Sequence, residues 1–164
     1  MDIYTGKRMR IEKNLVTFPG GRQKERIVVR PGGAVAMLPI DGEFCYLIRQ
    51  YRYAIDAWIY EVPAGTMEEG EKPSETAARE LIEEIGMAAA SLVPQGFVYT
   101  TPGYTDERIY LYEARGLTPS SEYDKDDDEQ IEVVKLKTAD IPGMIEEGTI
   151  VDAKTICLAW RCLR

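Results

Sequence analysis

The sequence contains no histidine among its 164 residues. This absence excludes a Ser-His-Asp triad, a Cys-His pair, a histidine nucleophile and zinc sites of the His-Glu-x-x-His type. Proton transfer near neutral pH must therefore depend on carboxylates, tyrosine, lysine, cysteine or metal-bound water.

Cysteine is also scarce, since only Cys45, Cys157 and Cys162 are present. Their number is odd and their spacing matches no zinc motif, so we expect free thiols in a reducing compartment. Cys45 and Cys157 lie in apolar stretches, which indicates packing in the core rather than reactivity.

The sequence lacks long hydrophobic runs, and acidic residues outnumber basic ones. The apolar run at 34–40 is too short to cross a bilayer, and the first residues, MDIYTGKRMR, contain no apolar signal region. Lys and Arg total 20 against 28 for Asp and Glu, a net charge of −8. This balance argues against a nucleic-acid or anionic-membrane binder. We therefore expect a cytoplasmic protein with no nucleic acid and no membrane among its partners.

The composition is that of an ordinary globular domain, with 45% apolar and 29% charged residues. A chain of this length forms one domain with one core. Strands are expected over residues 7–30 (two strands around the turn at Pro19-Gly20-Gly21), 34–40, 44–51, 57–62, 96–101, 108–115 and 131–137, and helices over residues 73–85, 140–147 and 152–163. Because these elements do not alternate regularly, they predict an α+β domain with helices packed on mixed sheets.

Three carboxylates gather on one side of the helix expected over residues 73–85. At about 100° per residue, Glu80, Glu83 and Glu84 occupy one sector and apolar side chains occupy a separate one. Such a pattern is most often a solvated acidic face. Carboxylate oxygens are also the ligands that magnesium takes in proteins, and a divalent ion would let an acidic chain bind a phosphate substrate.

Residues 65–87 read GTMEEGEKPSETAARELIEEIGM. This segment resembles the Nudix box, G-x5-E-x7-R-E-U-x-E-E-x-G-U with U apolar. The matching positions are Gly65, Glu71, Arg79, Glu80, Leu81, Glu83, Glu84, Gly86 and Met87. A match at every specified position with fixed spacing is specific. A P-loop is excluded, because Glu71-Lys72-Pro73 stands where that motif requires Lys followed by Ser or Thr.

The resemblance implies a Nudix fold, which is an α/β/α sandwich around a mixed β-sheet. It implies a single domain over residues 1–164, with an N-terminal strand pair over 1–32, a catalytic core over 33–164 and the box at 65–87. The implied activity is hydrolysis of the pyrophosphate in a nucleoside diphosphate linked to another group. Two or more Mg²⁺ or Mn²⁺ ions are implied as cofactors.

The resemblance also implies roles for individual residues. The metal ligands would be the carboxylates of Glu80, Glu83 and Glu84 and the carbonyl oxygen of Ala64. Glu83 would alternatively orient the attacking water. Arg79 would orient the glutamates, and Glu71 would brace the loop.

Further segments resemble the ADP-ribose pyrophosphatase branch of the family, namely RQYR at 49–52, EVPAG at 61–65 and TPGYTDE at 101–107. The substrate-binding residues that this resemblance implies are Arg26, Arg49, Arg52, Glu61, Pro102, Gly103 and Glu107. Arg49 and Arg52 lie three apart, so we expect only one of them to face the site. Arg52 is our choice, because a guanidinium fork suits phosphate or ribose oxygens.

The remaining parts of this resemblance concern the two ends of the substrate. Pro102 and Gly103 would form a wall of the pocket, and Glu107 would contact the terminal ribose. The branch usually carries Arg-Glu near the adenine, whereas this sequence has Glu25-Arg26. The sequence therefore specifies the recognition of the adenine base less completely than it specifies the hydrolysis of the pyrophosphate.

The acidic segment DDDEQIEVV at 126–134 resembles a loop and strand of the same branch, which implies Glu129 as the base or the water-positioning residue. The N-terminal strand pair resembles a segment that exchanges between subunits. It therefore implies a homodimer with N-terminal strand exchange.

The expected reaction is hydrolysis of ADP-ribose, a small nucleoside diphosphate, to AMP and ribose 5-phosphate. One alternative is a pyrophosphatase of other nucleotide sugars, such as GDP-mannose. Another is a binding module that holds ADP-ribose without cleaving it. A calcium-binding protein is less favoured, because the sequence contains no EF-hand pattern.

Overall fold

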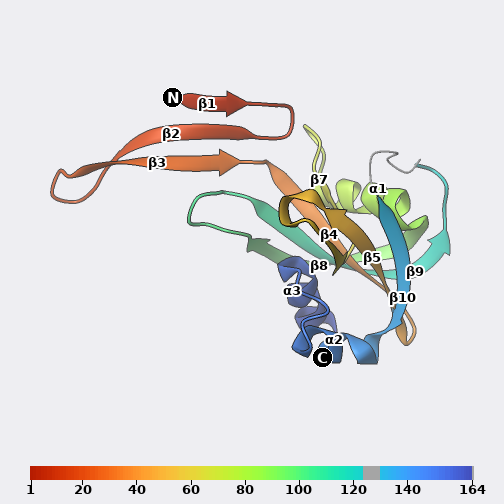
Figure 1. Cartoon of the computed structure of the whole chain (residues 1–164). Coiled ribbons are helices and arrows are strands. Elements are labelled where there is room, and N and C mark those ends of the chain that lie inside the picture. The colour runs from red at the N-terminus through yellow and green to blue at the C-terminus, as the bar shows by residue number, and fades with distance from the viewer. Residues whose placement is uncertain (124–129, 164) are drawn as a thin grey trace.

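The computed structural model describes residues 1–123 and 130–163 and contains two β-sheets (Figure 1). The smaller, antiparallel sheet consists of β1 (Asp2–Thr5), β2 (Arg10–Thr17) and β3 (Gln23–Arg30), and it extends away from the rest of the molecule. The two predicted N-terminal strands are confirmed as β2 and β3. We missed β1, because four residues are too few to show a clear alternation.

The larger sheet is mixed and has seven strands. They are β4 (Gly33–Asp41), β5 (Phe44–Arg52), β6 (Ala57–Glu61), β7 (Ala64–Thr66), β8 (Met87–Tyr99), β9 (Arg108–Pro119) and β10 (Ile131–Lys137). The order is β10-β5-β4-β9-β8, with β6 paired to β5 and β7 paired to β4. The pair β4–β9 is parallel and the other pairs are antiparallel, which confirms the predicted mixed sheet.

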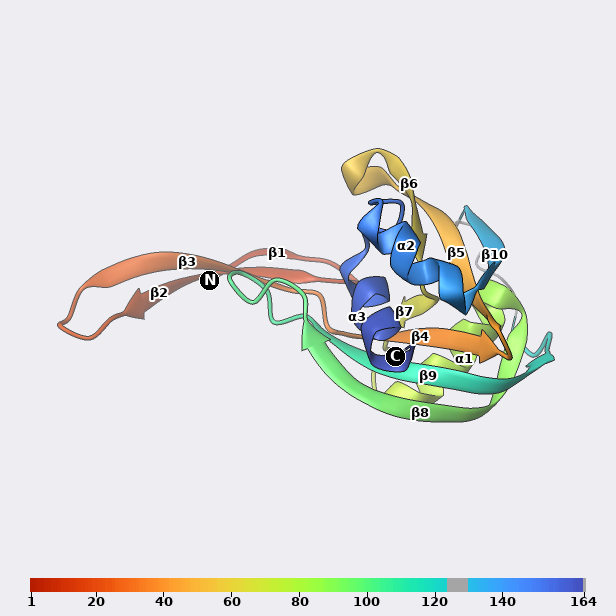
Figure 2. The same cartoon turned by 90° about the horizontal axis from the view of Figure 1, so that it is seen from below.

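Helices cover both faces of the larger sheet. Helix α1 (Pro73–Ile85) packs on one face, and α2 (Ile141–Glu146) and α3 (Ala153–Cys162) pack on the other. In Figure 2, α2 and α3 lie in front of the sheet and α1 lies behind it. The α/β/α sandwich is therefore confirmed.

The central strand β4 contributes to the core on both sides. Successive side chains of a strand point to opposite faces. Val35 and Met37 accordingly pack toward α1, whereas Ala36 and Leu38 pack toward α3. All four are buried, so residues 33–41 read as a nearly continuous hydrophobic run.

Strand β8 is the largest difference from the sequence prediction. We predicted a strand at 96–101, but β8 begins at Met87. Its pairing with β9 shifts register between Pro94 and Phe97, and Gly96 there has a φ of 84°. The shift breaks the alternation that reveals a strand. Pro94 is tolerated because β8 lies at the edge of the sheet.

The two sheets are joined by contacts between β3 and the loop before β9. The amide of Val29 donates to the carbonyl oxygen of Tyr104 at 2.8 Å. Arg30 and Asp106 form an ion pair at 2.6 Å. These contacts place the smaller sheet beside the end of β9 at which the strand begins.

The cysteines fit the expected pattern. In the described part of the chain none of the three forms a disulfide, and Cys45 is fully buried. Burial raises the pKa of the Cys45 thiol to about 11. Over the same residues, no helix has both the length and the apolar character that crossing a membrane requires.

Candidate active site

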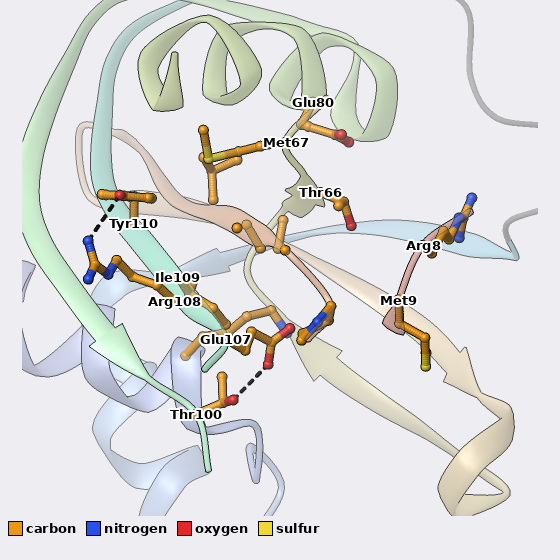
Figure 3. A pocket seen from close by; sticks show the side chains of 18 of the residues that line it. Arg8, Met9, Thr66, Met67, Glu80, Thr100, Glu107, Arg108, Ile109 and Tyr110 are labelled. Atoms are coloured by element: carbon orange, nitrogen blue, oxygen red, sulfur yellow. Dashed lines mark hydrogen bonds between the residues drawn. The ribbon is translucent and has the colours of Figure 1, made fainter. Parts of the chain in front are cut away.

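An open cavity of about 2100 Å³ is lined by residues from both sheets. Its walls come from the β1–β2 turn, the start of β4, the end of β5, β7 and the loop after it, α1, the β8–β9 loop and the start of α3. Figure 3 shows Glu80 on α1, with Glu107 and Arg108 beside the same cavity. The volume exceeds the roughly 300–1,000 Å³ of most ligand pockets because the cavity is open to solvent.

Gly65 lies directly against the carboxylate of Glu80. A Cβ at position 65 would lie 1.8 Å from Cδ of Glu80, and 2.0 and 2.3 Å from its two oxygens. Any side chain here would displace the carboxylate, so this close approach requires glycine.

Glu84 is the most buried of the three helical glutamates, with 6% of the residue exposed. Its Oε2 accepts a hydrogen bond from the amide of Ala64 at 2.8 Å. The bond joins α1 to β7, the strand that precedes it in sequence. Two of the predicted metal ligands, the backbone of Ala64 and the carboxylate of Glu84, are thereby neighbours.

Arg79 lies between the other two helical glutamates. Its Nη1 donates to Glu80 Oε1 and to Glu83 Oε2, both at 2.8 Å. Its Nε and Nη2 donate to the carboxylate of Glu71, at 3.0 and 3.1 Å. The bond to Glu71 is the main cause that raises the pKa of Arg79, so the guanidinium stays charged.

Glu71 connects the loop after β7 to the helix. Hydrogen bonds from Arg79 are the main cause that lowers the pKa of Glu71 to about 2, against a smaller opposing effect of burial. The carboxylate also accepts from the amide of Glu68 at 2.9 Å and from the hydroxyl of Thr76 at 2.8 Å. The loop is therefore held on the first turns of α1.

The three helical glutamates line one cavity without converging on one point. Among residues 1–123 and 130–163, no group of three or more acidic, histidine or cysteine side chains could by itself hold a metal ion. Arg79 holds Glu80 and Glu83, whereas Glu84 bonds to Ala64. The metal-ligand roles implied by the sequence therefore stay predictions.

The donor set nevertheless fits a hard divalent cation. Carboxylates from two turns of α1 line the cavity, and the absence of a side chain at Gly65 makes room for the carboxylate of Glu80. Magnesium binds to a few carboxylates together with waters and substrate phosphates. These residues could therefore hold Mg²⁺ or Mn²⁺ next to a phosphate.

On another wall, Arg52 forms a two-pronged ion pair with Glu61. The guanidinium Nε and Nη2 donate to Oε1 and Oε2 at 2.5 and 2.6 Å. Lys154 also donates to Oε2 of this carboxylate. Burial pushes the pKa of Glu61 upward, but Arg52 and Lys154 outweigh it, so the pKa lies below its ordinary value.

Our sequence reasoning missed Lys154, although one signal was present. Lysine at the second position of an expected helix faces the positive end of the helix dipole, which is unfavourable without an acidic partner. The sequence therefore indicated that Lys154 needs an acidic partner elsewhere in the chain. That the partner is Glu61 follows only from the tertiary structure, in which the first turn of α3 bonds to the segment at the end of β6.

The loop before β9 brings Glu107 to the cavity. Its Oε2 accepts a hydrogen bond from the hydroxyl of Thr100 at 2.7 Å (Figure 3). Pro102 and Gly103 lie in the same loop but are not among the described lining residues, whereas their neighbours Thr100 and Thr101 are.

Arg108 is a second lining residue that sequence reasoning missed. Its Nη2 donates to the hydroxyl of Tyr99 at 2.8 Å, and its Nη1 to that of Tyr110 at 3.4 Å. The guanidinium carbon lies 4.6 Å from the ring centre of Phe97. Arg108 and Tyr110 lie two residues apart in one predicted strand, so both side chains point to the same face. This spacing was the signal that the sequence offered.

Comparison with known proteins decides the family. Residues 30–158, more than half of the chain, match the NUDIX domain. The chain belongs to the Nudix family.

Several curated relatives are similar over most of their length. An ADP-ribose pyrophosphatase of Bacillus subtilis is 36% identical over 93% of this chain and 84% of its own. A methanol dehydrogenase activator of Bacillus methanolicus is 35% identical over 94% and 84%. A GDP-mannose pyrophosphatase of Cronobacter sakazakii is 30% identical over 84% and 76%.

A solved structure confirms the Nudix fold. The crystal structure of an ADP compounds hydrolase superposes with a TM-score of 0.88 at 23% identity. The superposition covers 98% of this chain and 87% of the other. At this level of identity the similarity establishes the fold alone.

Two predicted arginines are not among the residues that line the cavity, and one predicted glutamate lies outside the described residues. Arg49 bonds to Glu132 at 3.2 Å and lies 5.1 Å from the ring centre of Trp58. Arg26 lies on β3, and neither arginine is among the described lining residues. Glu129 lies outside the described residues. Their proposed roles stay predictions.

Proposed function

We propose that the protein hydrolyses the pyrophosphate bond of ADP-ribose to AMP and ribose 5-phosphate. The observation that carries this proposal is that the glutamates of a complete Nudix box line the same cavity as the Arg52–Glu61 pair. The similarity to an ADP-ribose pyrophosphatase over most of both chains supports this choice of substrate.

Two or more Mg²⁺ or Mn²⁺ ions would be held by the carboxylates of Glu80, Glu83 and Glu84 and by the carbonyl oxygen of Ala64. When bound, such ions neutralise charge on the diphosphate and lower the pKa of a coordinated water. Arg79 would keep Glu80 and Glu83 in position through the bonds described above.

The remaining site residues act on the substrate. Arg52 would bind phosphate oxygens with its guanidinium, because planar N–H donors suit such oxygens. Glu107 would accept hydrogen bonds from the terminal ribose. Glu129 or Glu83 would take the proton from the attacking water as it adds to phosphorus. Pro102 and Gly103 would support the loop at the pocket wall.

We also propose a homodimer formed through the smaller sheet. Ile3, Leu15 and Ile27 on its strands are 50%, 63% and 55% exposed. Apolar side chains gathered in this way favour burial against a second copy. Arg26 and Arg49, which the described structure leaves outside the cavity lining, would then reach substrate only across the interface.

The test is a hydrolysis assay with ADP-ribose and Mg²⁺, in which AMP is measured. Glu84→Gln should reduce kcat by orders of magnitude with an unchanged fold, because the variant loses a charged ligand. Glu146→Gln, a change at an exposed helical position, is the matched control. Glu129→Gln should slow turnover but retain metal affinity. Normal turnover by Glu84→Gln would refute the assigned site.

Two other functions are distinguished by the same assay. The similarity to a GDP-mannose pyrophosphatase favours GDP-mannose as the second candidate substrate. We expect a higher kcat/KM for ADP-ribose when both are measured side by side. Tight binding of ADP-ribose with no Mg²⁺-dependent turnover would instead indicate a binding module.

A further inference from the structure

Lys154 occupies a position that is unfavourable for a cation. It is the second residue of α3, directly after Asp152 and Ala153, and only 11% of its side chain is exposed. The positive end of the helix dipole and loss of water both disfavour a charged ammonium there. The positive charge on its Nζ is balanced by two carboxylates, because Nζ donates to Asp152 Oδ1 at 3.0 Å and to Glu61 Oε2.

Glu61 is the shared partner of two cations. The carboxylate is 1% exposed, and it accepts from Nε and Nη2 of Arg52 as well as from Lys154. A buried carboxylate left with a single partner carries a large desolvation cost. Arg52 and Lys154 together with Glu61 and Asp152 have no net formal charge, so each cation at this part of the cavity wall is balanced by a carboxylate.

Backbone contacts fix Lys154 independently of any ligand. Asp152 Oδ2 accepts from the amide of Thr155 at 3.0 Å and from its hydroxyl at 2.7 Å. The Thr155 hydroxyl in turn accepts from the amide of Val62 at 2.8 Å. Val62 directly follows Glu61 and leads through Pro63 to Ala64. The first turn of α3 is thus fastened to the segment that carries both Glu61 and the proposed backbone ligand.

Arg52, by contrast, lies at the open side of this group. Its side chain is 40% exposed and lines the cavity. A long arginine side chain loses much rotational freedom when it is ordered. Two N–H donors held by one buried carboxylate restrict the guanidinium to one direction before substrate arrives.

We infer that Lys154 is a positioning residue for substrate binding, which acts through Glu61 to hold Arg52 against the phosphate oxygens. This inference rests on the proposed function of the cavity. It assigns to the C-terminal helix a part in recognising the diphosphate, in addition to its packing on the sheet.

The first experiment separates KM from kcat. Lys154→Met should raise KM for ADP-ribose about tenfold, because a charge-assisted bond is lost. Because Lys154 does not touch the reacting atoms, kcat should change less than threefold. Lys154→Arg should restore most of the affinity, and the exposed Lys137→Met is the matched control. Titration calorimetry with ADP-ribose gives the same comparison without turnover.

The second experiment asks whether Lys154 acts through Arg52. In an Arg52→Ala background, Lys154→Met should cause no further rise in KM. An equal rise in both backgrounds would show direct contact with substrate and would overturn the inference. An unchanged KM in the Lys154→Met single variant would also overturn the inference. If Lys154→Met does not fold, Lys154→Gln retains a donor and should show a smaller rise.

Failure of the proposed function has a different signature. In that case the unmodified protein shows no metal-dependent hydrolysis of ADP-ribose. Failure of the role of Lys154 leaves that hydrolysis intact, and the single variant then resembles the Lys137→Met control.

Discussion

Replacing Gly65 by alanine gives the sharpest test of how the box is built. The new Cβ would lie 1.8 Å from Cδ of Glu80, whereas ordinary contact begins at 3.4 Å. The carboxyl group must therefore move by about 1.6 Å, the difference between 3.4 and 1.8 Å, to restore ordinary contact. Because the obstacle is the end of a flexible side chain, the fold should survive and Glu80 should be displaced.

The consequence for activity follows from metal geometry. Magnesium binds oxygen at about 2.0–2.1 Å and tolerates little distortion. A displacement larger than 1 Å would remove Glu80 from the proposed ligand set, and misplacement on that scale costs about 10²-fold in rate. We expect kcat/KM for ADP-ribose to fall at least about 100-fold, with a higher Mg²⁺ concentration needed for half-maximal activity.

The assay measures initial rates over a range of Mg²⁺ concentrations, with circular dichroism to monitor the fold. Gly143→Ala is the control, because a Cβ at this exposed helical position meets nothing within 4 Å. Its activity should be unchanged. A Gly65→Ala variant with normal rate and normal Mg²⁺ dependence would refute the link between this glycine and Glu80.

Two further predictions concern stability and assembly. The pKa of Glu71 lies at about 2, below its ordinary value of 4.5, so its stabilisation is complete above about pH 4.5 and is lost as the pH falls toward 2. Glu71→Gln should lower the free energy of unfolding at pH 7 by ~2 kcal/mol. Urea denaturation at decreasing pH should show that the difference between the variant and the unmodified protein becomes smaller. A difference that stays constant with pH would contradict the assignment. The proposed dimer predicts a light-scattering mass of twice 18.5 kDa, which Ile27→Lys should reduce to that of one chain; a monomeric unmodified protein would contradict it.

The sequence by itself determined the parts that depend on near neighbours. The bounds of α1 were predicted as residues 73–85 and are confirmed, because Pro73, the 3.6-residue periodicity and the left-handed Gly86 act locally. The spacing of Glu80, Glu83 and Glu84 on that helix follows from the same periodicity. The nine positions of the box sufficed to imply the family, which the NUDIX match confirms.

Only the tertiary structure decided which distant groups meet. The first part of strand β8, before the predicted residues 96–101, escaped prediction because a register shift between Pro94 and Phe97 interrupts its alternation. The sequence contained Gly65, but its need for glycine depends on Glu80 arriving from α1. Lys154 and Glu61 are 93 residues apart and meet only because the tertiary structure brings the first turn of α3 to the end of β6. Local conformation depends on residues a turn away, whereas a site assembled from strands of both sheets and from two helices depends on the packing of the whole core.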